Sequence, residues 1–184
     1  MNQTTITSNP TTDEPSALGL AVPDFTATAT GGDFVLSAHR GHSVVLYFYP
    51  KDNTPGCTTQ AQQFRDLHGE FVKAGCVVMG VSRDSLKSHE NFKAKFGLPF
   101  ELIADTQSAL CQMFNVIKNK MMYGKKVVGI ERSTFLIDAN GVLCHEWRGT
   151  KADGNAAIVL EKVTSLQKAG KCRFDGISGI LNRE

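Results

Sequence analysis

The sequence contains no apolar run that approaches the roughly 18 residues of a membrane-spanning helix, so we expect no transmembrane segment. Its first 20 residues lack the basic and apolar regions of a secretory signal. Its five cysteines include no CxxC pair and no regular spacing, which argues against a secreted disulfide framework and against a metal site of paired cysteines. These absences favour a reducing compartment, and we expect the cytoplasm.

The chain also has little excess of either positive or negative charge. A net charge of +2 over 184 residues gives no case for binding nucleic acid or an anionic membrane. The hydrophobic content of 41% and charged content of 21% are ordinary for a globular protein, and the length suits one domain. We expect a flexible arm over residues 1–19, the domain over residues 20–168 and a C-terminal extension over residues 169–184.

One stretch, residues 44–71, carries the clearest pattern in the chain. Residues 44–49 are all apolar or aromatic, which predicts a strand buried on both faces. Pro50 ends this strand, and after a polar loop Thr54 and Pro55 supply a favoured N-cap and first helical residue. The following residues recur at spacings of three and four, which predicts a helix with one buried face: Ala61, Phe64, Leu67, His68 and Phe71.

This pattern places Cys57 in the first turn of a helix, just after a buried strand. Open α/β folds bind ligands at that end of their strands. The free N–H groups and the macrodipole of a helix N-terminus favour a thiolate over a thiol, and the thiolate is the nucleophile. The alternative is a buried cysteine that acts as a small apolar side chain. The polar neighbours of Cys57 favour the reactive role.

The rest of the chain predicts an α/β fold with a central mixed sheet flanked by helices. An N-terminal β-hairpin is expected over residues 25–36, and a lysine-rich solvated loop over residues 115–126. The Asn140-Gly141 pair predicts a hairpin turn. Further strands are expected over residues 76–82, 100–104, 132–137 and 142–147, and further helices from Asp84 or Ser85 to Phe96, through Leu110 and Phe114, and over residues 156–166.

The motif Pro50-x3-Thr54-x2-Cys57 resembles the active-site motif of the peroxiredoxins. The longer string over residues 49–58, YPKDNTPGCT, resembles the bacterioferritin comigratory protein subfamily, also called the Q type. The resemblance continues in order through residues 80–82 (GVS), 96–100 (FGLPF), 123–126 (YGKK) and 129–138 (GIERSTFLID). It covers roughly residues 20–168 and implies a thioredoxin-like fold.

The resemblance implies a thiol-dependent peroxidase that reduces hydrogen peroxide and organic hydroperoxides in antioxidant defence and redox homeostasis. Cys57 would be the peroxidatic nucleophile and would become a sulfenic acid. Thr54 and Arg132 would bind the peroxide and stabilise charge, Pro50 would shield the site, and the backbone N–H groups of Gly56 and Cys57 would be further donors. No cofactor and no metal are implied.

Other roles for these residues remain open on the sequence alone. Thr54 serves equally well as a helix cap. Arg132 opens a predicted core strand, where a buried guanidinium needs an anion, and a carboxylate such as that of Asp138 would serve as well as a thiolate. His39 and His42 stand three apart and suggest either a metal site or, more simply, a polar connector.

The step after oxidation departs from much of the resembled subfamily. Many members carry a resolving cysteine five residues after the peroxidatic one, where this chain has Gln62, and others carry it in the next helix, which here has none. Cys76, Cys111 and Cys144 lie in predicted core elements, which leaves Cys172 as the outside candidate. We expect a one-cysteine cycle in a monomer or weak homodimer, with an external small thiol or thioredoxin-like protein as reductant.

Two other thioredoxin-like functions compete with the peroxidase. A thiol–disulfide oxidoreductase would need a second cysteine at position 60, which is Gln60. A copper carrier would need one near Cys57, and position 61 is Ala61. An added chaperone or interaction role stays open.

Overall fold

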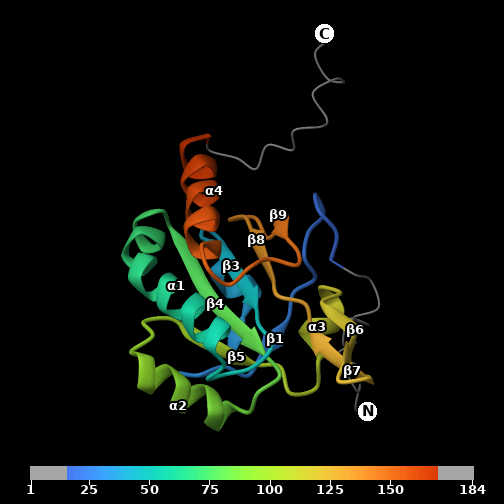
Figure 1. The fold of residues 1–184 in the computed structure, drawn as a ribbon. Helices are drawn as coiled ribbons and strands as arrows, with labels where there is room; N and C mark the ends of the chain where they lie inside the picture. The colour runs from blue at the N-terminus through green and yellow to red at the C-terminus, as the bar shows by residue number, and fades with distance from the viewer. Residues whose placement is uncertain (1–15, 170–184) are drawn as a thin grey trace, which may run out of the picture.

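The computed structural model describes residues 16–169, and its centre is a five-stranded sheet in the order β5-β4-β3-β8-β9 (Figure 1). β3 pairs in parallel with β4 and antiparallel with β8, so the predicted mixed sheet is confirmed. The strands are β3 (Ser43–Phe48), β4 (Cys76–Ser82), β5 (Glu101–Ala104), β8 (Ser133–Ile137) and β9 (Leu143–Trp147).

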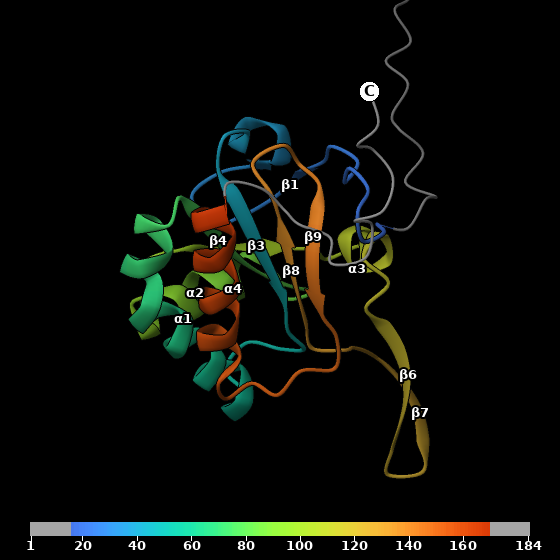
Figure 2. The same ribbon diagram turned by 90° about the horizontal axis from the view of Figure 1, so that it is seen from above.

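Both faces of the sheet are covered, as the apolar run at residues 44–49 predicts. Alternate residues of this run pack on opposite faces: Leu46 and Phe48 in one core cluster, Tyr47 and Tyr49 in the other. Three helices cover the second face (Figure 2): α1 (Pro55–Lys73), α2 (Leu86–Phe96) and α4 (Asn155–Ala169). The first face is covered by α3 (Ala109–Met113), β1 (Thr26–Ala27), β2 (Phe34–Val35) and the 3-10 helix η1 (Leu36–His39).

The predicted loop over residues 115–126 is wrong. This segment forms most of an antiparallel hairpin of β6 (Ile117–Met122) and β7 (Lys125–Ile130), which extends from the body as an arm (Figure 2). Its two-residue turn, Tyr123 and Gly124, has φ values of 52° and 75°, and positive φ at both positions is the favoured geometry of a tight hairpin. The sequence of this segment, with its four lysines, shows no alternation of apolar and polar residues, because neither face of the hairpin is buried at its tip.

The other boundaries lie close to the expected ones. Ser85 caps α2, since its side chain accepts a hydrogen bond from the Ser88 backbone N–H. Arg132 lies just before β8 and not inside it, and Leu36 belongs to η1 and not to the hairpin. His39 stacks on the ring of Phe34, which gives it a packing role. Within residues 16–169, no helix is both long and apolar enough to cross a membrane.

Candidate active site

Cys57 is the third residue of α1, and only 2% of its surface is exposed. The loop after β3 leads to Thr54, whose extended backbone (φ −85°, ψ 151°) is that of an N-cap, and Pro55 then begins the helix. The Cys57 thiol therefore lies where the free N–H groups of the first helical turn gather. It is one of the free cysteines of the structure.

Arg132 reaches this thiol from the other side of the chain. β8 runs antiparallel to β3 and pairs Ser133 with Phe48, so Arg132 lies beside the end of β3 from which the Cys57 loop begins. Its Nη2 lies 3.4 Å from Cys57 Sγ. The alternative pairing with Asp138 does not occur, because Asp138 lies beyond the other end of β8 and accepts from the Asn140 and Val142 backbone N–H groups.

A hydrogen-bonded chain of three buried polar side chains, which sequence reasoning missed, leads to the guanidinium, and its first member contacts Arg132 directly. Gln60 Oε1 accepts a hydrogen bond from Arg132 Nη1 at 2.5 Å, and Gln60 Nε2 donates to Asn155 Oδ1 at 2.9 Å. Thr134 Oγ1 donates to the same Asn155 oxygen at 2.9 Å. A glutamine on the buried face of α1, one turn after Cys57, was the available signal, because a buried amide needs partners.

The remaining predicted site residues lie around Cys57 in different ways. The Thr54 hydroxyl donates to the Lys51 carbonyl at 2.8 Å and makes no side-chain cap bond. A Cβ at Gly56 would lie in van der Waals contact with Arg132 Nη2, at 3.4 Å, so Gly56 lies directly beside the guanidinium. Pro50 is exposed and follows the buried Tyr49.

The other cysteines have different surroundings. Cys76 pairs with Ser43 at the opposite end of β3 from the Cys57 loop, and burial raises the pKa of its thiol to about 12. Burial, aided by the Asp105 carboxylate, raises the pKa of Cys111 well above its usual value. Cys144 is buried in β9. The predicted candidate Cys172 lies outside the described residues.

A cavity of about 350 Å³ lies at the Cys76 end of β4. Its lining includes Phe34, His68 and Phe100 as well as Cys76. This is the opposite end of the sheet from Cys57, so the cavity is separate from the candidate site.

A family profile and the relatives of known sequence point to the same protein family. The profile of the AhpC/TSA family matches residues 18–146. The peroxiredoxin Bcp of Xanthomonas campestris is 52% identical over 158 residues, which cover 85% of this chain and 99% of that protein. The peroxiredoxin Bcp of Bacillus subtilis is 45% identical over 152 residues, covering 82% of this chain and 97% of that one.

A solved structure agrees with these relatives. It is that of the Xanthomonas campestris bacterioferritin comigratory protein, from a study of its alkyl peroxide reduction activity. The two folds match with a TM-score of 0.77 and 49% identity, over 84% of this chain and 99% of that chain. The chain therefore belongs to the AhpC/TSA family and, within it, to the peroxiredoxins of the bacterioferritin comigratory protein type, which are thiol-dependent peroxidases.

Proposed function

We propose that Cys57 is the peroxidatic nucleophile of this peroxiredoxin and that it reduces hydrogen peroxide and organic hydroperoxides. The observation that carries the proposal is the contact of 3.4 Å between Arg132 Nη2 and Cys57 Sγ in the first turn of α1. A guanidinium and the free N–H groups of a helix N-terminus both favour the thiolate, the reactive form of a cysteine.

The reaction transfers one oxygen to sulfur. The Cys57 thiolate attacks the terminal oxygen of the peroxide ROOH, the S–O bond forms as the O–O bond breaks, and the alkoxide that leaves takes up a proton. Arg132 and the backbone N–H groups of Gly56 and Cys57 stabilise the negative charge as it moves onto oxygen. The Thr54 hydroxyl already donates to the Lys51 carbonyl, so its oxygen is left to accept a hydrogen bond from the peroxide O–H.

An external thiol completes a one-cysteine cycle. The first thiol attacks the Cys57 sulfenic acid and releases water, and a second thiol reduces the mixed disulfide to regenerate the Cys57 thiol. A dithiol such as a thioredoxin-like protein, or two small thiols, supply both electrons. We place this activity in antioxidant defence in the cytoplasm, in a monomer or weak homodimer.

The thiol–disulfide oxidoreductase alternative is less well supported. Gln60 stands where that chemistry needs its second cysteine, and its amide is engaged with Arg132 and Asn155.

Consumption of hydrogen peroxide in the presence of dithiothreitol tests the proposed function. The wild type should consume peroxide catalytically, Cys57→Ser should not, and Cys76→Ser should keep the wild-type rate, because Cys76 is buried at the far end of the sheet. Equal consumption by wild type and Cys57→Ser would rule out Cys57 as the nucleophile.

A further inference from the structure

A buried polar cluster lies beneath the loop that leads into the active site. Asp52, in the middle of this loop, is only 5% exposed, although most aspartates lie at the surface. Its Oδ1 accepts from the Tyr49 hydroxyl at 2.6 Å, and its Oδ2 accepts from the Ser88 hydroxyl at 2.8 Å and lies 2.8 Å from His89 Nδ1. The Asp52 backbone N–H donates to Asp84 Oδ2 at 3.0 Å.

Both ring nitrogens of His89 have buried polar partners. Its side chain is fully buried, with Nδ1 against the Asp52 carboxylate and Nε2 3.0 Å from the Ile103 carbonyl oxygen. The Ile103 carbonyl can only accept, so Nε2 carries a proton and donates to it, while Nδ1 and the Asp52 carboxyl share a second proton in a hydrogen bond. The Asp52–His89 contact is therefore a buried, directional hydrogen bond whose other polar atoms are also hydrogen-bonded.

This pair joins three separate parts of the fold. Asp52 belongs to the loop between β3 and α1, His89 to α2, and Ile103 to β5. Two residues after Asp52 comes Thr54, and α1 with Cys57 begins directly after it. Fixing Asp52 therefore fixes the segment that carries the Thr54 hydroxyl and the first turn of α1.

Stability alone is a weak reason for such a pair. The desolvation of buried polar groups offsets much of what their hydrogen bonds contribute, and replacing such a buried pair with apolar side chains often leaves a protein as stable or more so. A directional contact does what apolar packing cannot, because it holds one atom at a set place. A misplacement of about 1 Å in a reacting site can cost about 10²-fold in rate.

We propose that Asp52 and His89 are positioning residues for the peroxidase reaction, which hold Thr54 and the first turn of α1 in line with Arg132. The proposal rests on the proposed role of Cys57. Neither residue touches the thiol in the structure, so each acts through the loop.

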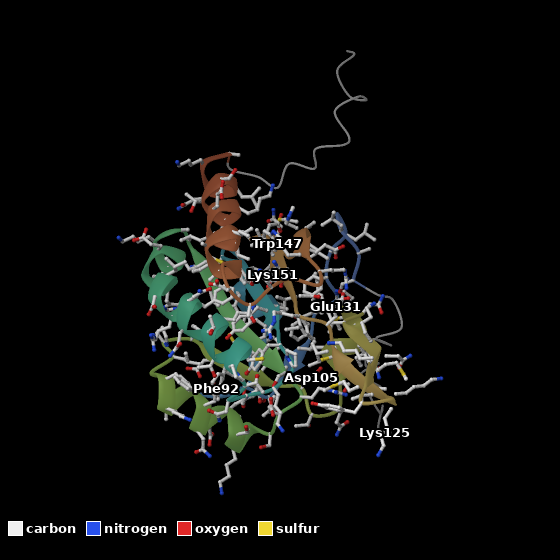
Figure 3. All side chains as sticks on the ribbon, viewed as in Figure 1. Phe92, Asp105, Lys125, Glu131, Trp147 and Lys151 are labelled. Carbon is white, nitrogen blue, oxygen red and sulfur yellow. The ribbon has the colours of Figure 1, made fainter. Side chains whose placement is uncertain are left out.

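Two substitutions at one position separate positioning from general damage. In His89→Asn, the side-chain amide nitrogen lies near the place of Nδ1, so this variant keeps a donor to Asp52. In His89→Gln, the amide nitrogen lies near the place of Nε2, so this variant keeps only the donor to the Ile103 carbonyl. A matched control is Phe92→Leu, because Phe92 is a fully buried residue of the same helix outside the pair (Figure 3). Two rates are measured for each: oxidation of Cys57 by hydrogen peroxide, and its alkylation by iodoacetamide.

We expect His89→Gln to slow oxidation by about 10²-fold and His89→Asn to retain much more of the rate. Phe92→Leu should lose stability and keep the wild-type oxidation rate. Alkylation, which needs a thiolate but no aligned donors, should change little in any of them. If His89→Gln does not fold, Tyr49→Phe removes one bond to Asp52 and should slow oxidation without slowing alkylation.

Other results would reject the positioning role. A folded His89→Gln or Tyr49→Phe variant that is oxidised at the wild-type rate would reject it. Equal losses of oxidation rate in His89→Asn and His89→Gln would reject it as well. So would a loss of alkylation rate that parallels the loss of oxidation rate. A wild-type protein that peroxide does not oxidise at Cys57 would instead reject the proposed function itself.

Discussion

Cys57, Cys76 and Cys111 are three buried thiols with different chemical surroundings. Cys57 lies at a helix N-terminus beside a guanidinium. Burial dominates at Cys76, and burial together with a nearby carboxylate outweighs the more weakly acting Arg83 at Cys111. Burial disfavours a thiolate and a neighbouring cation favours it. Reactivity at this scale therefore follows from the neighbours of the sulfur and not from the number of cysteines.

Selective alkylation tests this difference. At pH 7 we expect limiting iodoacetamide to label Cys57, because the raised pKa values of Cys76 and Cys111 keep both as thiols. Peptide mapping of the labelled, folded protein measures the distribution. Comparable labelling of Cys76 or Cys111 under these conditions would contradict the assignment.

Arg132 and Thr54 allow a second test at the residue scale. Loss of one preorganised donor typically costs about 10²–10³-fold in rate, so Arg132→Ala should slow peroxide reduction by that amount with a smaller effect on the midpoint of urea unfolding. Thr54→Val should also be impaired and Thr54→Ser should keep much of the activity, since serine retains the hydroxyl. Stopped-flow oxidation measures both, and a fully active Thr54→Val would leave Thr54 with a structural role only.

At the scale of the elements, the site is assembled by four segments that meet at one end of the sheet. α1 supplies Cys57 and Gln60, the residue before β8 supplies Arg132, and the first residue of α4 supplies Asn155. The loop before α1 is tied to α2 through Asp52. A rate change is therefore expected from substitutions on helices that never contact the peroxide.

The Asp52 carboxyl also links this loop to acid stability. Burial alone would raise its pKa, but hydrogen bonds from His89, Tyr49 and Ser88 outweigh burial and lower the pKa below its usual value. A lowered pKa stabilises the folded state above the unfolded pKa of about 3.9, and the contribution is lost as the pH falls through the folded value.

We therefore expect the difference in free energy of unfolding between wild type and Asp52→Asn to be present at pH 7 and to shrink below about pH 4. Urea unfolding at a series of pH values measures it. A difference that stays constant down to pH 3 would show that the carboxylate charge contributes nothing.

At the scale of the whole molecule, the question is how the oxidised cysteine returns to the thiol. Of the other cysteines in residues 16–169, Cys76 lies at the far end of the sheet and Cys111 packs against its opposite face. We expect one equivalent of peroxide to leave a Cys57 sulfenic acid that dimedone traps, with no disulfide to Cys57. Mass spectrometry of the intact protein and a peptide map measure this. A stoichiometric disulfide between Cys57 and any cysteine of the chain, Cys172 included, would replace the one-cysteine cycle.

Local sequence determined the parts of this protein that depend on near neighbours. The apolar run at residues 44–49, the Thr54-Pro55 start of α1 and the Asn140-Gly141 turn each depend on contacts or dihedral angles within a few residues. The same is true of Cys57 in the first helical turn. The β6–β7 hairpin could not be predicted in this way, because its exposed strands show no clear apolar alternation and its Tyr123-Gly124 turn is not one of the common hairpin dipeptides such as Asn-Gly.

Only the tertiary structure decided which distant side chains meet. Arg132 and Cys57 are brought together by the antiparallel pairing of β3 and β8, and Gln60 reaches Asn155 through the packing of α1 beside α4. Asp52 and His89 belong to the same class, since each alone reads as an ordinary loop or helix residue. Periodicity reports which face of an element is buried, but a buried polar atom finds its partner through the register of strands and the packing of helices far apart in the chain.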